Sequence, residues 1–302
     1  MRVLHIDLGR ELRGGQHQVL LLLKTLRGAG HTSTLMAQAD SPLAKSAVEL
    51  GINVVAGSLF ALRKLSSSHE IVHAHDARSH SWAAISSRVP FVVSRRVAFP
   101  VSKSVLSKIK YGRAARFLAV SQFVANQLRV AGVPPTKIDI VYDAVELATN
   151  AQTWSADAPV IAIASADPQK GRDLIERASE LGRIPITFSS DLPKHLSRAS
   201  VFVYISRSEG FGSAALLAMS MGVPVIASRI DGMVEVIEDG VSGIAVDNKP
   251  EAIAGAIKRV LENPDLAKSL IEQAHRRVET YFDTNGLLNK TLASYRRTLG
   301  AE

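Results

Sequence analysis

The most informative segment for the fold of this chain is Ser206–Ser228, SRSEGFGSAALLAMSMGVPVIAS. It follows a short apolar run, Val201–Ile205, that has the length and composition of a buried strand. A loop with Gly210 and Gly212 then leads into an apolar helical segment, Ser213–Met221. Small residues let a loop backbone approach a ligand, and the free N–H groups of a helix start favour an anion. The stretch therefore predicts a strand–loop–helix unit whose loop is either a ligand site or an ordinary tight turn.

The same alternation of short apolar runs and helical segments extends in both directions from this stretch. Further strands are expected at Val3–Asp7, Thr32–Met36, Ile52–Val55, Ile71–His75, Phe91–Ser94, Phe117–Val120, Ile138–Tyr142, Val160–Ala164, Ile184–Phe188, Val223–Ala227 and Gly243–Val246. Further helices are expected at Gln16–Leu26, Leu43–Leu50, Ser79–Arg88, Lys103–Tyr111, Gln122–Ala131, Gly171–Leu181, Glu251–Glu262, Asp265–Tyr281 and Asn285–Leu299. Alternating β and α elements imply parallel sheets covered on both faces. Residues 145–159 lack periodicity, so the 302-residue chain is expected to hold two domains that meet there.

Charge is distributed unevenly between the two halves. Residues 1–145 hold 19 Lys+Arg and 8 Asp+Glu, whereas residues 146–302 hold 17 and 20. From Ala77 to Lys137 there are 11 Lys+Arg and no acidic residue. A basic domain attracts an anionic partner, which here is a phosphorylated substrate or an anionic membrane surface; the alternative is a solvated basic face. No nucleic-acid-binding module matches, and aromatic residues are only 5%, so we expect no nucleic-acid partner.

The block Glu209–Ser228 resembles the donor-site motif of the group 1 (family 4) glycosyltransferases of the GT-B fold. That motif reads E-G-F-G, followed by a second Glu eight residues after the first. Weaker similarities are the sequences IVYDAVE at 140–146, AVS at 119–121, and the pattern from Asp231 to Gly243. The resemblance implies two Rossmann-like domains whose parallel sheets face each other across a cleft. The domains would be an acceptor-side domain, 1–145, and a donor domain, 146–284, with a last helix, 285–302, that crosses back to the first domain.

The resemblance also assigns the site residues. In the family the donor is a nucleotide sugar. Glu209 would contact its sugar, and Lys170 would neutralise its diphosphate; these two are the expected catalytic residues. A lysine suits that role as a compact cation beside a leaving phosphate. Donor binding by backbone is implied for Gly14, Gly15, Phe211, Gly212 and Ser213. Acceptor-side roles are implied for His75, Arg95 and Arg96.

Three departures from the family pattern stand beside these assignments. The second Glu of the motif, which binds the ribose hydroxyls, is replaced by Leu217. The arginine five residues before the family's lysine is replaced by Ser165. The stretch from Leu181 to Val201 is too short for the family's two strand–helix units. These changes predict weak nucleotide binding on an unchanged fold.

A metal site is not expected. His73 and His75 lie on one side of a strand end, a spacing that suits a metal ligand pair, but no third ligand motif and no Asp-x-Asp accompany them. The chain has no cysteine, which excludes disulfides and thiolate chemistry. Because the nucleotide sugar is a co-substrate, no cofactor is expected.

The sequence therefore predicts a retaining, metal-independent glycosyltransferase that moves a sugar from a nucleotide-sugar donor to an anionic glycan or lipid-linked acceptor. Lipopolysaccharide, another cell-envelope glycan or a glycolipid is the expected context. The alternatives are a non-catalytic GT-B protein that binds a glycan or a partner, and a GT-B sugar-nucleotide epimerase. Met1–Gly15 lacks the pattern of a secretion signal. We expect a cytoplasmic protein that touches the inner face of an anionic membrane through the basic, apolar-interleaved segment 100–116.

Overall fold

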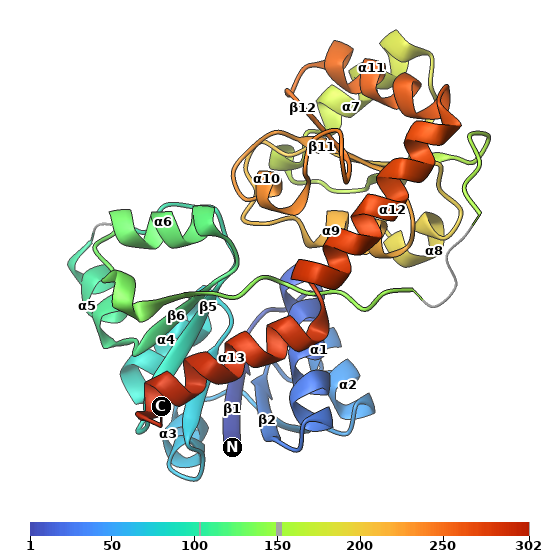
Figure 1. Cartoon of the computed structure of the whole chain (residues 1–302). Helices are drawn as coiled ribbons and strands as arrows, with labels where there is room; N and C mark the ends of the chain where they lie inside the picture. The colour runs from blue at the N-terminus through green and yellow to red at the C-terminus, as the bar shows by residue number, and fades with distance from the viewer. Residues whose placement is uncertain (103, 149–152, 302) are drawn as a thin grey trace. The chain divides into compact units, whose positions relative to one another are not determined.

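The computed structural model describes residues 1–102, 104–148 and 153–301. Lys103 of the predicted membrane segment and residues 149–152 of the predicted boundary lie outside the described residues. The chain folds as two compact units (Figure 1). Unit 1 comprises Met1–Asp143 and the segment from Thr284 to the C-terminus, and unit 2 comprises Ala144–Asp283. Each unit has its own parallel sheet, which confirms the predicted α/β class with two Rossmann-like domains.

The described part of unit 1 is built on a seven-stranded sheet with the order β3-β2-β1-β4-β5-β6-β7. The strands are β1 Arg2–Asp7, β2 Thr32–Ala37, β3 Asn53–Ala56, β4 Ile71–Ala74, β5 Phe91–Arg95, β6 Arg116–Ala119 and β7 Ile138–Ile140. All neighbouring strands are parallel. Because β1 lies between β2 and β4, its carboxyl end is the point where the strand order reverses, which is where open α/β sheets bind ligands.

Helices cover both faces of this sheet. They are α1 Gly14–Gly28, α2 Pro42–Glu49, α3 Leu59–Ser66, α4 Ala77–Ser86, α5 Val105–Arg113, α6 Gln122–Val130 and α13 Thr284–Leu299, with a 3-10 turn η1 at Pro135–Lys137. The last helix, α13, packs against α1 and against β5, β6 and β7. In Figure 1 it runs beside α1 as the red helix of unit 1. On another part of unit 1, α4 packs against both α3 and α5.

Unit 2 has a five-stranded sheet in its described residues, with the order β12-β11-β10-β8-β9. The strands are β8 Val160–Ile163, β9 Ile186–Ser189, β10 Val201–Tyr204, β11 Val225–Ser228 and β12 Ile244–Val246. The helices are α7 Arg172–Gly182, α8 Leu192–Leu196, α9 Ser213–Ser220, α10 Met233–Val236, α11 Pro250–Leu261 and α12 Pro264–Tyr281, with a 3-10 turn η2 at Pro168–Lys170. Between α7 and β10 the chain forms only β9 and α8, as the short spacing predicts.

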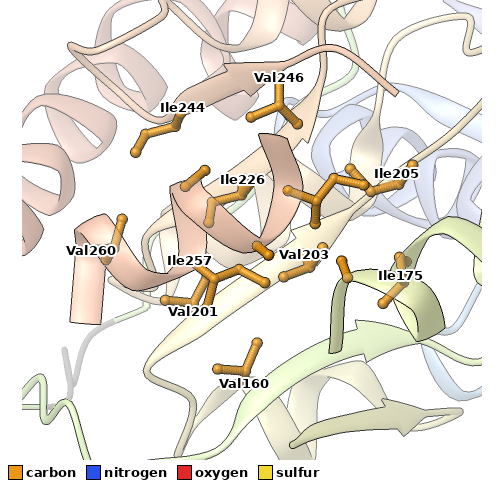
Figure 2. Packing of buried hydrophobic residues seen from close by; sticks show 14 of the residues in the cluster. Val160, Ile175, Val201, Val203, Ile205, Ile226, Ile244, Val246, Ile257 and Val260 are labelled. Atoms are coloured by element: carbon orange, nitrogen blue, oxygen red, sulfur yellow. The ribbon is translucent and has the colours of Figure 1, made fainter. Parts of the chain in front are cut away.

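The core of unit 2 lies between its sheet and the helices α7 and α11. Figure 2 shows Ile257 and Val260 of α11 directed at strand residues such as Val201 and Ile226, with Ile175 of α7 beside them. These five side chains are all buried, with exposed fractions of 1% or less. Burial of an aliphatic side chain of this size contributes about 1.5–3 kcal/mol, so this layer fixes the strands whose ends form the site described next.

Three short helices, α3, α8 and α10, are absent from the sequence prediction. The α3 helix begins after Ser58, whose hydroxyl accepts a hydrogen bond from the N–H of Ala61 at 3.0 Å. Its one buried apolar side chain is Leu62, so little of the helix packs on the core. The α8 helix has five residues and is capped by Asp191. The α3 and α8 helices each begin at a residue whose side chain caps the first turn. None of the helices in the described residues combines the length and the apolar character needed to cross a membrane.

Candidate functional site

The candidate site of unit 2 lies at the carboxyl ends of three adjacent strands. Strand β10 ends at Tyr204, and the chain then forms the glycine-bearing loop that leads to α9 at Ser213. The loop after β8 carries Lys170, and the loop after β11 carries Asp231. Since β10 lies between β8 and β11 in the sheet, these three loops meet at one edge.

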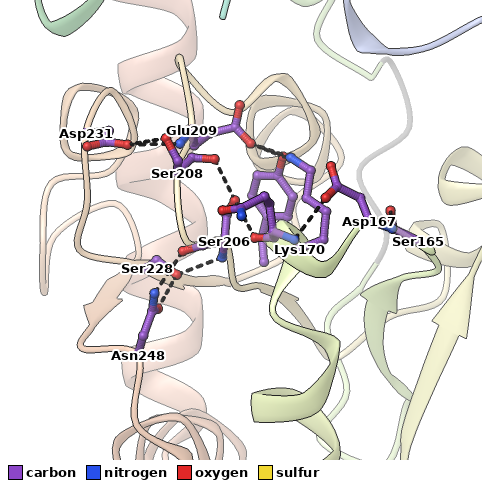
Figure 3. Close-up of polar contacts among 11 residues, drawn as sticks. Ser165, Asp167, Lys170, Ser206, Ser208, Glu209, Ser228, Asp231 and Asn248 are labelled. Carbon is purple, nitrogen blue, oxygen red and sulfur yellow. Dashed lines mark hydrogen bonds and ion pairs between the residues drawn. The ribbon is translucent and has the colours of Figure 1, made fainter. Parts of the chain in front are cut away.

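Lys170 and Glu209 form an ion pair at the centre of this edge (Figure 3). The Lys170 Nζ and the Glu209 Oε2 are 2.6 Å apart, and the two side chains are only 23% and 15% exposed. Tyr204 completes a triangle: its hydroxyl donates to the Glu209 Oε2 at 2.6 Å and accepts from the Lys170 Nζ at 2.9 Å. Burial, followed by the nearby Glu209 carboxylate, raises the pKa of the Tyr204 hydroxyl well above its ordinary value. The phenol is therefore a permanent hydrogen-bond donor to the carboxylate.

Polar contacts from β11 hold the Glu209 loop in place. Asp231 accepts hydrogen bonds from the backbone N–H of Glu209 at 3.1 Å and from the Ser208 hydroxyl at 2.9 Å. At the base of the loop, the backbone N–H of Ser206 donates to the Ser228 hydroxyl at 2.9 Å, and that hydroxyl donates to Asn248 at 2.6 Å. Figure 3 shows these contacts on the side of Glu209 away from Lys170. The carboxylate is thus fixed by its own backbone as well as by its partners.

Two glycines allow the loops to approach each other closely. Gly171 has φ +56°, and a Cβ there would lie 2.7 Å from the Ile205 Cγ2 and 3.2 Å from the Ile205 carbonyl oxygen. Gly212 has φ +116°, and a Cβ there would lie 2.9 Å from the Met233 Sδ. Both positions require a left-handed backbone, which side chains other than glycine rarely adopt. Glycine at both sites is therefore a condition of this loop geometry.

The residues expected to bind the donor by their backbone take up the start of α9. Gly212 occupies the N-cap position and Ser213 is the first helical residue. The Phe211 ring is 2% exposed and packs edge-on against Phe282, with ring centroids 5.4 Å apart. Its side chain therefore belongs to the core, and only its backbone is available to line a site. An open hollow of about 620 Å³ lies beside the loop that carries Lys170; it is lined by Ser165, Ala166, Asp167, Pro168, Gln169, Arg172, Asp173, Glu176 and Arg207.

In unit 1, Gly14 and Gly15 form the first residues of α1 rather than a loop before it. The Gln16 side chain accepts from the backbone N–H of Arg13 at 3.2 Å and so caps the helix two residues earlier than apolar periodicity predicts. No heavy atom lies within 4 Å of the place where a Cβ would sit on Gly15. Buried Asp7, at the end of β1, accepts hydrogen bonds from the N–H of Gly9 and the side chain of Gln16. Burial is the main cause that raises the pKa of Asp7.

Three buried histidines gather where β1 and β4 run side by side. His5 is paired in register with His73, and the His5 Nδ1 lies 3.0 Å from the His75 Nε2. The three residues offer ligand atoms that all lie within 4.8 Å of one another. Both ring nitrogens of His73 already have partners, the Tyr295 hydroxyl at 2.7 Å and the Ser94 hydroxyl at 2.8 Å. Burial lowers the pKa of His5 to about 3 and places those of His73 and His75 well below their ordinary value.

The two arginines after β5 point to different partners. Arg96 forms an ion pair with Asp143, with its Nε 2.9 Å from the Oδ1, and its Nη1 lies 3.5 Å from the His75 Nδ1. Arg95 donates to the Tyr111 hydroxyl at 2.8 Å and to the carbonyl oxygen of Phe99. The structure thus brings His75 and Arg96 together, whereas Arg95 is turned toward α5. The positive charge of Arg96 is balanced by Asp143.

Family models match both units. The model of glycosyl transferases group 1 matches residues 168–277, and the model of glycosyltransferase family 4 matches residues 12–149. The first match contains the Lys170–Glu209 pair, and the second contains Gly14, His75 and Arg96. The chain belongs to the group 1 glycosyltransferases.

Curated relatives match this chain over part of their length. A D-inositol 3-phosphate glycosyltransferase of Acidothermus cellulolyticus is 35% identical over 117 residues, which are 36% of this chain and 25% of the relative. The capsular polysaccharide biosynthesis glycosyltransferase CapM of Staphylococcus aureus is 28% identical over 101 residues, which are 33% of this chain and 25% of the relative. The alignments thus span about a quarter of these relatives.

Solved structures share the fold over nearly the whole chain. Anabaena Alr3699/HepE, in complex with UDP and glucose, superposes with a TM-score of 0.85 at 16% identity and covers 98% of this chain and 100% of its own. A glycosyltransferase from Rickettsia africae superposes with a TM-score of 0.77 at 20% identity, covering 100% and 99%. At these identities the likeness shows the fold, which is that of GT-B enzymes.

The structure also shows candidate site residues that sequence reasoning missed. In the sequence, Tyr204 looks like an ordinary buried strand residue. Only its hydrogen bond to Glu209 identifies it as part of the candidate site. His5 supplies the third imidazole of the cluster, which the spacing of His73 and His75 does not contain. His5 could have been recognised from the order of the sheet, because β1 lies beside β4 and so places His5 next to His73. Leu217, in the position of the family's ribose-binding Glu, is half-buried on α9.

Proposed function

We propose that this protein is a retaining glycosyltransferase that moves a sugar from a nucleotide-sugar donor to a cell-envelope glycan or glycolipid acceptor without a metal ion. The observation that carries the proposal is the Lys170–Glu209 ion pair on the glycine-bearing loops of unit 2, within the segment that the group 1 model matches. The position of the pair at the carboxyl edge of a parallel sheet supports a nucleotide-binding role. The solved complexes of Alr3699/HepE contain UDP or UDP-glucose, which makes UDP-sugars the first donors to test.

Each residue has a distinct role in this proposal. Lys170 supplies the positive charge that accepts the developing negative charge of the leaving diphosphate, as a preorganised cation does without reorganisation. Glu209 accepts hydrogen bonds from the sugar hydroxyls and stabilises positive charge that develops on the ring. The backbone N–H groups at the start of α9, from Gly212 and Ser213, face the donor. The acceptor oxygen bonds to the anomeric carbon on the face from which the diphosphate leaves, as the bond from that carbon to the phosphate oxygen breaks. The leaving phosphate takes the proton of the acceptor hydroxyl, and attack on this face preserves the anomeric configuration.

Unit 1 supplies the acceptor side in this proposal. Gly14 and Gly15 present the open start of α1 to the donor phosphate. His75 and Arg96 orient an acceptor hydroxyl or an anionic group beside it, and Arg95 holds the neighbouring loop. The basic character of residues 77–137 fits an anionic acceptor. The protein would act in the cytoplasm, at the inner face of the membrane, where lipid-linked acceptors and nucleotide sugars are both accessible.

A donor screen and a product assay test the proposal. Thermal shift with UDP-, GDP-, ADP- and CMP-sugars should show stabilisation by one nucleotide class, since a ligand at 100 times its Kd adds about 2.7 kcal/mol. Proton NMR of the transfer product should show the donor's anomeric configuration, and the activity should survive EDTA. An inverted product or a loss of activity with EDTA would remove the corresponding part of the proposal. The Glu209→Gln variant is the control for both assays.

A non-catalytic GT-B binding protein is the second candidate, and two observations favour it. Leu217 cannot hydrogen-bond a ribose, and Ser165 carries no charge for a diphosphate. The Ser165 hydroxyl instead accepts from the backbone N–H of Asp167 at 3.1 Å. The non-catalytic function is favoured over the glycosyltransferase if no nucleotide sugar shifts the melting temperature while a glycan does. The epimerase alternative requires a product from the nucleotide sugar alone, which the same NMR assay detects.

A further inference from the structure

Helix α5 has its apolar side turned outward. Val105, Leu106 and Ile109 are 72%, 81% and 56% exposed. The opposite side of the helix carries Lys110, whose Nζ lies 3.3 Å from the Ser81 hydroxyl of α4, and Tyr111. None of the described side chains of α5 is buried. A surface helix normally packs its apolar stripe on the core and leaves its polar side in water, so α5 has the reverse arrangement.

The loop before α5 extends this apolar surface. Phe99 is 63% exposed and Val97 is 43% exposed. Arg95 links the loop to the helix, since its guanidinium donates to the carbonyl oxygen of Phe99 and to the hydroxyl of Tyr111. We call Val97, Phe99, Val105, Leu106 and Ile109 the α5 patch. Single exposed apolar residues are common, but a group that shares one helix side and its adjoining loop marks an interaction surface.

The charge around the α5 patch is positive. Lys108 and Arg113 are exposed on the same helix, and no Asp or Glu occurs between Ala77 and Lys137. A second copy of the chain would bring like charges together at this surface. An anionic bilayer would neutralise them, at about 1 kcal/mol per basic residue near the surface, and would accept the apolar side chains at its headgroup boundary.

We infer that the α5 patch docks this protein on an anionic lipid bilayer, with Phe99, Leu106 and Ile109 entering the interface. The inference rests on the proposed function, because it names the surface on which a lipid-linked acceptor would be met. Arg95 is the last residue of β5 and neighbours Arg96, so the docking surface is continuous in the chain with the acceptor-side residues.

Vesicle sedimentation tests the docking surface. The wild-type protein should sediment with phosphatidylcholine vesicles that contain phosphatidylglycerol, should not sediment with phosphatidylcholine alone, and should lose binding as salt is added. The double variant Leu106→Ser/Ile109→Ser should weaken binding by about tenfold or more, since each side chain loses its transfer into the interface. The matched control is Leu181→Ser, which removes a leucine that is 58% exposed on α7 of unit 2. It should bind vesicles as the wild type does.

Three outcomes would overturn the inference: no sedimentation of the wild type with either vesicle, equal binding by the double variant, or a concentration-dependent dimer that the double variant dissolves. The last outcome would assign the patch to a second copy of the chain. Calorimetry with the nucleotide from the donor screen separates this test from the proposed function. A failed docking surface leaves nucleotide binding intact in all variants, whereas a failed donor site leaves vesicle binding intact.

A second, independent observation concerns Tyr204. Its hydroxyl contacts both members of the Lys170–Glu209 pair, at 2.9 and 2.6 Å, while its ring stacks near Phe202 with centroids 5.7 Å apart. The side chain is 4% exposed, so its orientation is fixed by the strand. From this geometry we infer that Tyr204 is a positioning residue that sets the distance between the lysine and the carboxylate.

The Tyr204→Phe variant tests this role, because it removes one hydroxyl and keeps the ring. We expect kcat to fall about 10- to 100-fold with a smaller change in KM, as for the loss of a hydrogen bond to a charged group. A lower melting temperature with unchanged kcat and KM would reduce Tyr204 to a packing residue.

Discussion

At the residue scale, Glu209 is the side chain on which the proposed chemistry depends most. It sits on a loop, 15% exposed, with its carboxylate held by Lys170 and Tyr204. We expect Glu209→Ala to lower transfer by a hundred- to a thousandfold, the loss of about 2.7–4 kcal/mol of transition-state stabilisation. The melting temperature should change little, since no core packing is removed. Steady-state kinetics with the best donor check this, and unchanged turnover would remove Glu209 from the mechanism.

Leu217 carries the second prediction at this scale. It lies on α9, which begins at the candidate donor site, and it is half-buried rather than enclosed in the core. Leu217→Glu should tighten nucleotide binding by about tenfold, because a carboxylate would restore charge-assisted hydrogen bonds to the ribose worth about 1.5–3 kcal/mol. Calorimetry with the nucleotide from the donor screen measures the change. If neither the wild type nor the variant binds any nucleotide, the result favours a non-catalytic binding protein over a glycosyltransferase.

At the scale of elements, the approach of the loop after β8 to the end of β10 depends on Gly171. Gly171→Ala should lower stability and donor affinity together, because its Cβ would lie 2.7 Å from the Ile205 side chain and would move the neighbouring Lys170. Gly240→Ala is the matched control: it also has a positive φ, +71°, but nothing lies within 4 Å of its Cβ position. Both variants should lose about 1–2 kcal/mol from backbone strain. Only Gly171→Ala should weaken donor binding, and equal affinities in thermal shift titrations would contradict this.

Strands and helices were predictable where apolar periodicity was strong. They were less predictable where a capping side chain or a packing partner determined whether the element forms. The apolar run Val201–Ile205 and the glycines after it suffice for β10 and the site loop. The α5 helix was predictable as a helix with an apolar and a basic side. Which side would face solvent was not, because periodicity defines the faces of a helix but not its rotation about its axis.

At the scale of the whole molecule, the buried histidines of unit 1 make stability depend on pH. Burial lowers the pKa of His5 to about 3, against 6.5 ordinarily, and lowers those of His73 and His75 well below that value. Below pH 6.5 the unfolded chain therefore binds protons that the folded chain does not, so the free energy of unfolding falls as the pH is lowered. Each such histidine removes about 1.4 kcal/mol per pH unit in this window. The stability is complete above about pH 7 and is lost progressively toward pH 3.

Thermal melts between pH 7.5 and 5 measure this dependence. The melting temperature should fall steeply below pH 6.5, and His5→Asn should make the fall shallower because one titrating group is removed. Near-neutral melts of this variant should show a cost from the lost contact with His75. A melting temperature that stays flat from pH 7.5 to 5 would mean that the cluster is not buried as described.

The local features of this protein follow from its amino-acid sequence alone. Alternating apolar periodicity determined two α/β units, the Glu209–Ser228 block determined the family, and the replacements at Leu217 and Ser165 were visible without coordinates. Local patterns suffice for these because each depends on neighbours within one strand, loop or helix. The tertiary structure decided which distant residues meet: Lys170 with Glu209 and Tyr204, His5 with His75, and the outward rotation of α5. These pairings depend on strand order and on packing between elements, and neither is written in the spacing of residues along the chain.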